Sequence, residues 1–293
     1  MPDTALAVAF SLANAVAVTF LNLVVRRAEG YANAATGVLI GLLACLPVMA
    51  AATFYLWQPG WWDWRAWAVF AASGAAGPSI ARVLLFLSIH RLGVPRAAPL
   101  ISTMPLAAAV MGTAFLGERP GPVVLAGTVL IAAGCMAITW KGGEDKSWNR
   151  RDLWLPFASV AAFSLSHLLR KLGLALVPSP LLGLTVMSAA GAAFLWLFGR
   201  ALAKEQRPAL GTRAAWGMYG LAGVFNSIAV LLHFYALRHG DLTVVIPLAS
   251  TAPFFSLLLS PIFLRGMEPV TRLIVAGTAL VVLGGALITW RVL

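Results

Sequence analysis

The chain has 293 residues, of which 60% are hydrophobic and only 11% are charged. A soluble domain carries about 25% charged residues to cover its surface, so this composition excludes a large soluble globular protein. The net charge of +11 does not indicate nucleic-acid binding, because the basic residues stand singly or in pairs in short connectors between apolar runs. The sequence therefore predicts a polytopic integral membrane protein.

Ten apolar stretches follow one another along the chain, each close to the roughly 20 residues that a helix needs to cross a bilayer. The expected transmembrane helices are 4–25, 33–56, 66–90, 95–116, 121–140, 152–174, 180–202, 214–237, 242–264 and 270–290. The most polar segment, 141–151, is interpreted as a linker between a first domain, 1–140, and a second, 152–293. The two cysteines, Cys45 and Cys135, lie inside apolar stretches and indicate neither a disulfide nor a metal site.

The two halves of the chain are related in sequence. Segments 127–140 and 277–290 are identical at seven of 14 positions, and the order of polar and proline residues upstream also repeats. Each half has five expected helices, an odd number, so the second half must enter the membrane from the opposite side. The predicted fold class is therefore all-α, with ten transmembrane helices arranged as two inverted five-helix repeats, a design common in secondary transporters.

The distribution of basic residues predicts the orientation. Connectors after the odd-numbered helices hold 14 Lys and Arg residues, and the opposite side holds six, including Arg170 and Lys171 near the end of the sixth helix. Because cytoplasmic connectors are enriched in Lys and Arg, both termini are expected outside the cell. Arg170-Lys171 is interpreted as the counterpart of Arg26-Arg27, which leaves Arg82 as the only charge expected deep in the membrane.

Arg82 is the first candidate for substrate binding. It lies nine residues before Arg91, hence about 13 Å along the helix from that end. A buried cation in a transmembrane helix indicates a functional site, and a carboxylate or phosphate is its natural ligand. The alternative is an arginine satisfied by backbone carbonyls and water at a helix kink. All ten acidic residues fall at helix ends or in connectors, and Glu118 and Glu268 are interpreted as caps of the helices that follow them.

Further polar residues lie inside the expected helices. His167 and His233 are the deep histidines, and each could bind substrate, carry a proton, or serve only as a hydrogen-bonded packing residue. Pro99, Pro105, Pro247 and Pro253 predict kinks in the fourth and ninth helices. The hydroxyls beside these prolines either contact substrate or only satisfy the interrupted backbone. The predicted substrate-binding residues are Arg82, Asn14, Ser79, Ser102, Thr103, His167, Asn226, His233, Ser250 and Thr251.

This pattern resembles the drug/metabolite transporter superfamily and, within it, the EamA-type transporters, which include the YddG-type amino-acid exporters. The residues that carry the resemblance are Pro99, Pro105, Glu118, Gly127 and Gly134 in the first half and Pro247, Pro253, Glu268, Gly277 and Gly284 in the second. Small multidrug members of the superfamily bind cations and protons at a glutamate in the first helix, where this chain has Asn14 and Asn22. Several relatives are thought to keep both termini in the cytoplasm, so resemblance and charge count differ on orientation.

The resemblance implies an inner-membrane transporter, not an enzyme, that needs no cofactor or metal and has a small-molecule substrate and the lipid bilayer as its partners. We expect a monomer that exports or exchanges amino acids, including aromatic ones, by alternating access. The first alternative is a drug, nucleotide-sugar or organic-anion transporter of the same superfamily. The alternative of another class is a membrane scaffold, or a flippase or enzyme that acts on lipid head groups.

Overall fold

The computed structural model describes residues 2–28, 30–139, 149–202, 204–263 and 272–293. Its α-helices are α1 (Pro2–Arg27), α2 (Ala34–Tyr55), α3 (Trp64–Gly74), α4 (Arg82–Leu92), α5 (Val94–Ile101), α6 (Met104–Leu116), α7 (Pro122–Thr139), α8 (Trp154–Leu176), α9 (Pro180–Phe198), α10 (Arg213–His239), α11 (Leu242–Ala249), α12 (Ala252–Phe263) and α13 (Arg272–Val292). A π-helical turn, η2 (Ala75–Ala81), joins α3 to α4. The short 3-10 helices are η1 (Pro59–Trp61), η3 (Arg150–Leu153), η4 (Gly199–Ala201) and η5 (Lys204–Gln206).

The predicted all-helical membrane fold is confirmed. Within the described ranges, nine helical segments are long and apolar enough to cross a membrane. The ninth expected helix, 242–264, forms two shorter helices, α11 and α12, which are separated at Ser250 and Thr251. Most of the expected linker 141–151, and also Glu268, lie outside the described residues.

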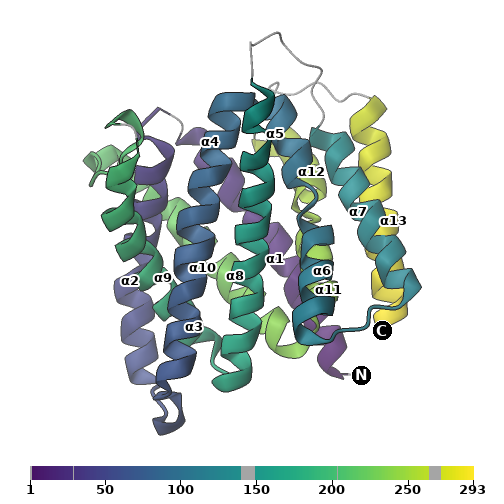
Figure 1. The fold of residues 1–293 in the computed structure, drawn as a ribbon, viewed down its shortest axis with the longest axis horizontal. Helices are drawn as coiled ribbons and strands as arrows, with labels where there is room; N and C mark the ends of the chain where they lie inside the picture. Colours follow the sequence, from purple (N-terminus) through teal and green to yellow (C-terminus); the bar gives the residue numbers. More distant parts are fainter. Residues whose placement is uncertain (1, 29, 140–148, 203, 264–271) are drawn as a thin grey trace.

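The two halves run in opposite directions through the bundle. In Figure 1, α1 starts at the lower edge and ends at the upper edge, whereas α8, the first long helix of the second half, runs downward. The last helices of the halves, α7 and α13, lie side by side. Glycines permit their close approach, since a Cβ at Gly134 would lie 2.5 Å from the Gly277 carbonyl oxygen, and one at Gly127 2.7 Å from that of Gly284.

The third expected helix, 66–90, is not a regular α-helix throughout, because a π-helical turn that the sequence did not predict interrupts it. Pro78 has no N–H to donate to the backbone carbonyl of Gly74, so the helix widens into η2 at this point. Ser79 Oγ donates to the Gly74 carbonyl at 3.3 Å and to the Gly191 carbonyl of α9 at 2.8 Å. The interruption ends at Ala81, so Arg82 is the first residue of α4.

The fourth and ninth expected helices break at equivalent places. Pro99 and Pro247 lie inside α5 and α11, and Pro105 and Pro253 lie in the first turns of α6 and α12. The four hydroxyl side chains at the breaks donate to backbone carbonyls three or four residues earlier, at 2.6 to 3.0 Å; they belong to Ser102, Thr103, Ser250 and Thr251. The same four carbonyls also accept the backbone N–H of the hydroxyl-bearing residue, at 2.9 to 3.2 Å, so each hydroxyl adds a second hydrogen bond at the break.

The lower face of the bundle is held by two charged side chains at the turn between α10 and α11. Glu118, only 9% exposed, accepts hydrogen bonds from the backbone N–H groups of Leu242 at 2.7 Å and Thr243 at 2.8 Å. Lys171 Nζ donates to the Leu237 carbonyl at 2.8 Å. The prediction that Glu118 caps the helix after it is wrong. Because the repeats interlock, this carboxylate instead reaches the amino end of α11, in the other half, where an anion suits the helix dipole.

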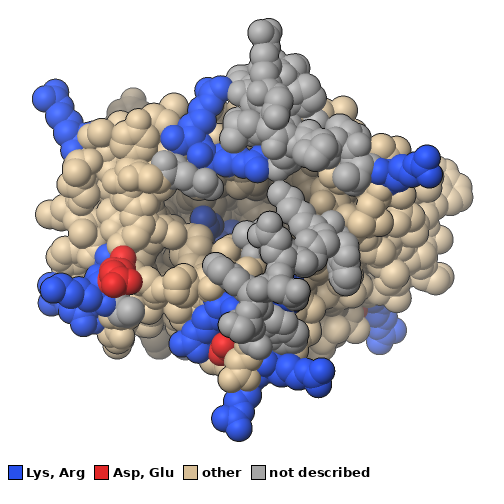
Figure 2. Space-filling model, turned by 90° about the horizontal axis from the view of Figure 1, so that it is seen from above, with Lys and Arg blue, Asp and Glu red and all other residues tan. Residues whose placement is uncertain are grey.

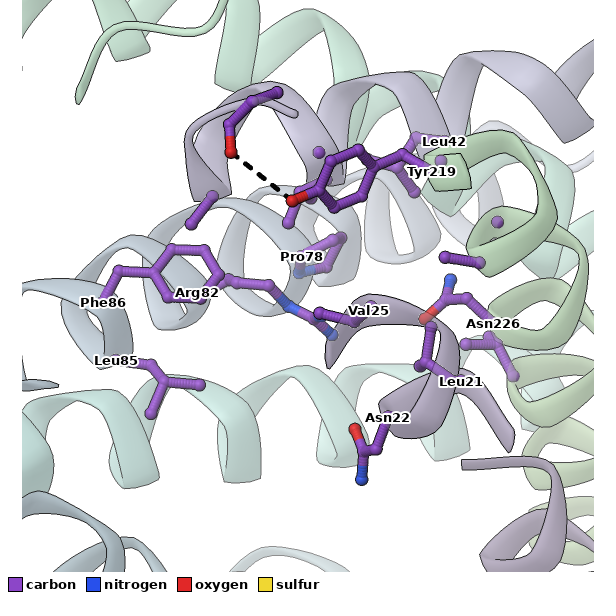
Figure 3. A pocket seen from close by; sticks show the side chains of 18 of the residues that line it. Leu21, Asn22, Val25, Leu42, Pro78, Arg82, Leu85, Phe86, Tyr219 and Asn226 are labelled. Carbon is purple, nitrogen blue, oxygen red and sulfur yellow. Dashed lines mark hydrogen bonds between the residues drawn. The ribbon is translucent and has the colours of Figure 1, made fainter. Parts of the chain in front are cut away.

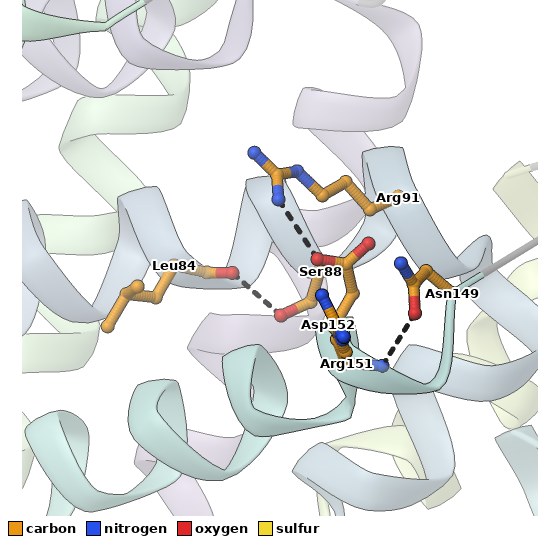
Figure 4. Close-up of polar contacts among 6 residues, drawn as sticks. All are labelled: Leu84, Ser88, Arg91, Asn149, Arg151 and Asp152. Atoms are coloured by element: carbon orange, nitrogen blue, oxygen red, sulfur yellow. Dashed lines mark hydrogen bonds and ion pairs between the residues drawn. The ribbon is translucent and has the colours of Figure 1, made fainter.

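At the upper face, the first half contacts the start of the second. Arg91 of α4 forms an ion pair with Asp152 of η3 at 2.9 Å, and Asn149 caps η3 by accepting a hydrogen bond from the Arg151 N–H at 3.0 Å (Figure 4). Half of the Arg91 side chain remains exposed. An exposed pair of this kind contributes about 1 kcal/mol or less, so it orients the connector more than it stabilises the fold.

Candidate substrate-binding cavity

One cavity of about 420 Å³ enters the bundle from the upper face. Seen from that face, the molecule is hollowed at its centre and a basic side chain is visible inside the hollow (Figure 2). Residues of α1, α2, η2, α4, α8, α9 and α10 line the cavity, so both halves of the chain contribute. The lining includes Asn22, Val38, Pro78, Arg82, Leu85, Phe86, Phe163, Arg170, Tyr219, Asn226 and Val230.

Arg82 projects into this cavity from the first turn of α4. Its side chain passes between Pro78 and Val25 (Figure 3). The kink at η2 positions it, since Arg82 directly follows the π-helical turn. Its Nε is buried and has no hydrogen-bond partner among the residues that the structure describes. Arg82 therefore stands at a helix kink, as the alternative expected, but its Nε has no partner within the described ranges.

Arg170 is a second cation at the same cavity, so the prediction that it lies at the membrane edge together with Lys171 is wrong. It lies inside α8, six residues before the end of that helix, and is only 6% exposed. Its Nη2 donates to Ser166 Oγ at 3.4 Å, and its Cζ lies 5.6 Å from the centroid of the Phe234 ring. Gly77 leaves room for this arrangement, since a Cβ there would lie 2.5 Å from Ser166 Oγ. Arg82 is therefore not the only charge deep in the membrane.

The two guanidinium groups dominate the electrostatics of the cavity. None of the described residues that line it is acidic, and the Nε atoms of both Arg82 and Arg170 are buried without a hydrogen-bond partner in the described ranges. An uncompensated buried charge costs several kcal/mol even after the protein relaxes. The cavity is thus arranged to favour an anionic group that could compensate both cations.

The rest of the lining is mostly apolar. Phe86 and Phe163 contribute aromatic rings, while Val38, Leu85 and Val230 contribute aliphatic side chains. Asn22 and Asn226 add amide groups, and the Tyr219 hydroxyl donates to the Ala32 carbonyl at 3.4 Å (Figure 3). Such a lining suits a ligand with an apolar body and one strongly charged end.

Two of the predicted binding residues, Arg82 and Asn226, line the cavity. Of the others, Asn14 Nδ2 donates to the Ala229 carbonyl at 2.6 Å and thereby links α1 to α10, and Ser79 contacts the backbone of α9. The structure does not bring these two residues, or the four hydroxyls at the helix breaks, to the described lining. Arg170 and Asn22, which do line it, were not among the predicted binding residues; the available signal for Arg170 was its position inside the expected helix 152–174.

His167 and His233 form a pair behind the cavity. Their ring centroids are 4.7 Å apart and their planes are tilted by 53°. His233 is 3% exposed. His167 Nδ1 and His233 Nε2 have no hydrogen-bond partner among the described residues. The two rings lie one helical turn from Arg170 and Val230, which line the cavity, so the pair lies directly behind its wall.

Comparison with known proteins identifies the family. The model of the EamA-like transporter family matches residues 4–140 and again residues 151–290. The chain belongs to the EamA-like transporter family. Members of this family are membrane transporters rather than enzymes, which assigns this chain a small-molecule substrate and a lipid environment. The YddG-type subtype stays a prediction.

Structural comparison agrees with the fold. One solved structure, described only as the crystal structure of a protein, is similar over 99% of this chain and 98% of its own, with a TM-score of 0.78. At 15% identity, this likeness shows the shared fold and nothing about substrate. A search of curated proteins finds no match to the chain.

Proposed function

We propose that this protein is a secondary transporter of small amphipathic organic anions, which it moves across the inner membrane by alternating access between its two repeats. The observation that carries the proposal is the pair of buried arginines, Arg82 and Arg170, in one cavity without a neighbouring acid among the described residues. A carboxylate or phosphate would receive charge-assisted hydrogen bonds from these guanidinium groups. The apolar lining would hold the body of the substrate.

Amino acids, the cargo predicted from the sequence, meet only part of this requirement. Their carboxylate suits Arg82, but their ammonium group would enter a cavity that already holds two cations and has no described acidic residue in its lining. Aromatic amino acids would still gain from Phe86 and Phe163. The organic-anion alternative is therefore the better match, with aromatic amino acids as weaker substrates.

The shape of the cavity supports alternating access. The cavity opens at the upper face, where the connectors after the odd-numbered helices lie, whereas Glu118 and Lys171 hold the lower face together. If those connectors are cytoplasmic, as the Lys and Arg bias predicts, the cavity faces the cytoplasm. Correcting the position of Arg170 changes the predicted bias only from 14 against six to 14 against five, because it removes one residue from the minority side.

Transport by purified protein in proteoliposomes tests the proposal. Counterflow should be compared for four compounds built on one benzene ring: isophthalate, benzoate, phenylalanine and benzylamine. We expect isophthalate and benzoate to be transported, phenylalanine weakly, and benzylamine not at all. Arg82→Gln should reduce benzoate flux by at least about tenfold, the loss expected for one charge-assisted hydrogen bond of about 1.5 kcal/mol.

The matched control is Arg238→Gln, because Arg238 is exposed at the end of α10, far along the helix from the cavity. This variant should retain wild-type flux. Equal transport of benzylamine and benzoate, or an unchanged benzoate flux in Arg82→Gln, would refute the anion assignment. The same liposomes also test the monomer prediction, since flux per protein should not depend on the protein-to-lipid ratio.

A further inference from the structure

The histidine pair has a chemistry that anion binding alone does not use. We propose that His167 and His233 form a proton-binding site whose occupancy is coupled to anion binding at Arg170, so that one proton moves with each anion in the same direction. This inference rests on the proposed function. It adds a second transported species, the proton, and a site for it.

Geometry limits the pair to one proton. The ring centroids lie 4.7 Å apart, so two protonated rings would place like charges in direct contact. Each ring has a buried nitrogen without a hydrogen-bond partner among the described residues, Nδ1 on His167 and Nε2 on His233. Either nitrogen can accept a proton, because no hydrogen bond to a described residue already occupies it.

Burial of the rings and the charges around them together determine when the pair can accept a proton. Arg170, three residues after His167 on α8 and against the ring of Phe234, is the cation that acts on both rings. Arg82 of α4 lies across the same cavity. No described residue of η2, α6, α9 or α11 is ionisable, and α3 has only Arg65, exposed near its start.

The remaining ionisable side chains near these helices have other partners or lie at helix ends. Tyr235 stacks on Phe10, with ring centroids 5.3 Å apart, and His239 pairs with Asp3. Lys171 and Glu118 bind the ends of α10 and α11 at the lower face, with Asp241 exposed beside them. Thus the pair faces positive charge, without a described carboxylate to offset it inside the membrane.

An anion at the arginines reverses this balance. While Arg170 is uncompensated, its charge repels a proton from the two rings; a bound anion cancels that charge and removes the repulsion. A hydronium ion then gives a proton to one ring nitrogen: an N–H bond forms, one O–H bond of the hydronium breaks, and water is left. By linkage, the protonated pair must in turn strengthen anion binding by the same factor. Anion and proton therefore bind together and leave together.

Proton uptake on anion binding tests the coupling directly. The probe is benzenedisulfonate, a strong acid anion that binds no proton itself near neutral pH. It is added to the purified full-length protein in weakly buffered detergent solution with a pH-sensitive dye, and binding is followed in parallel by tryptophan fluorescence. We expect proton uptake that approaches one per anion bound as the pH falls, and in that range an affinity for the anion that rises about tenfold for each pH unit.

The chain has four histidines, which supply matched variants. His167→Gln and His233→Gln should bind the anion with no proton uptake and with a flat pH dependence, whereas His90→Gln and His239→Gln should behave as wild type. Thermal unfolding of each variant checks that it is folded; if one of the first pair fails to fold, the other still decides. Anion binding without proton uptake by the wild type, or unchanged uptake in both His167→Gln and His233→Gln, would overturn the coupling and leave the proposed function intact. A wild type that does not bind the anion at all would overturn both.

Discussion

The cap that Glu118 forms on α11 can be tested by its effect on stability, and Asp241 beside it supplies the control. Its carboxylate accepts two hydrogen bonds, at 2.7 and 2.8 Å, from the first backbone N–H groups of α11. A hydrogen bond to a charged group contributes about 1.5 to 3 kcal/mol. Glu118→Gln keeps one acceptor oxygen and loses the charge, so it should reduce the free energy of unfolding by about 1.5 to 3 kcal/mol.

Thermal unfolding in detergent measures this loss. For a chain of this length, 1 kcal/mol corresponds to roughly 2 °C in Tm, so Glu118→Gln should lower Tm by about 3 to 6 °C and Glu118→Ala by about twice as much. Asp241→Asn is the control. Asp241 occupies the cap position of α11, is exposed, and makes no capping hydrogen bond, so its replacement should shift Tm by about 1 °C or less. A larger effect for Asp241→Asn than for Glu118→Gln would refute the assignment of the cap to Glu118.

Three further predictions follow from contacts elsewhere. A Cβ at Gly223 would lie 2.4 Å from a carbonyl oxygen of α2, whereas one at Gly217 on the same helix would meet nothing within 4 Å. Gly223→Ala should therefore lower the free energy of unfolding by about 1 to 3 kcal/mol. Gly217→Ala, the control, should leave thermal stability unchanged or raise it. Asn14→Ala should lower the free energy of unfolding by about 0.5 to 2 kcal/mol without changing KM for benzoate, because Asn14 links α1 to α10 and does not line the cavity. Asn226→Ala should raise KM, because Asn226 does line the cavity. Equal effects of the two variants on KM would contradict these separate roles. In intact cells, Leu293→Cys should react with a membrane-impermeant maleimide while the wild type, whose two cysteines are buried, does not; protection of Leu293→Cys would place the termini in the cytoplasm.

The sequence predicted the architecture well because membrane helices leave a strong, local signal. Span length, the repeat of Gly127 and Gly134 in Gly277 and Gly284, and the paired prolines are all readable along one chain. The same glycines form the close contact between α7 and α13. Each of these features depends on local composition or on a comparison of the two halves.

The candidate site was less predictable because it depends on where side chains point. Arg170 is adjacent to Lys171 in sequence, and together they resemble the end of a helix. In the structure, Lys171 binds carbonyls at the lower face, whereas Arg170 turns to the cavity, where Gly77 of another helix makes space for it. No pattern within α8 alone reveals that space.

Glu118 was misassigned for a related reason. A carboxylate before a helix favours capping of that helix, and this local rule gave the wrong partner. The bound amide groups belong to residues 124 and 125 positions later in the chain, which only the interlocking of the repeats brings close. Both wrong predictions, for Arg170 and for Glu118, concern contacts between the two halves of the chain, which no single helix reveals in its sequence.

The central claim, that Arg82 and Arg170 bind one anionic group together, is tested most directly by a double-mutant cycle. The affinity for benzenesulfonate, which carries a single anionic group, is measured for the wild type, Arg82→Gln, Arg170→Gln and the double variant. If both guanidinium groups contact the same anion, the two losses should be non-additive, with a coupling energy of about 1 kcal/mol or more. Losses that add within about 0.5 kcal/mol, or unchanged affinity in either single variant, would contradict the claim.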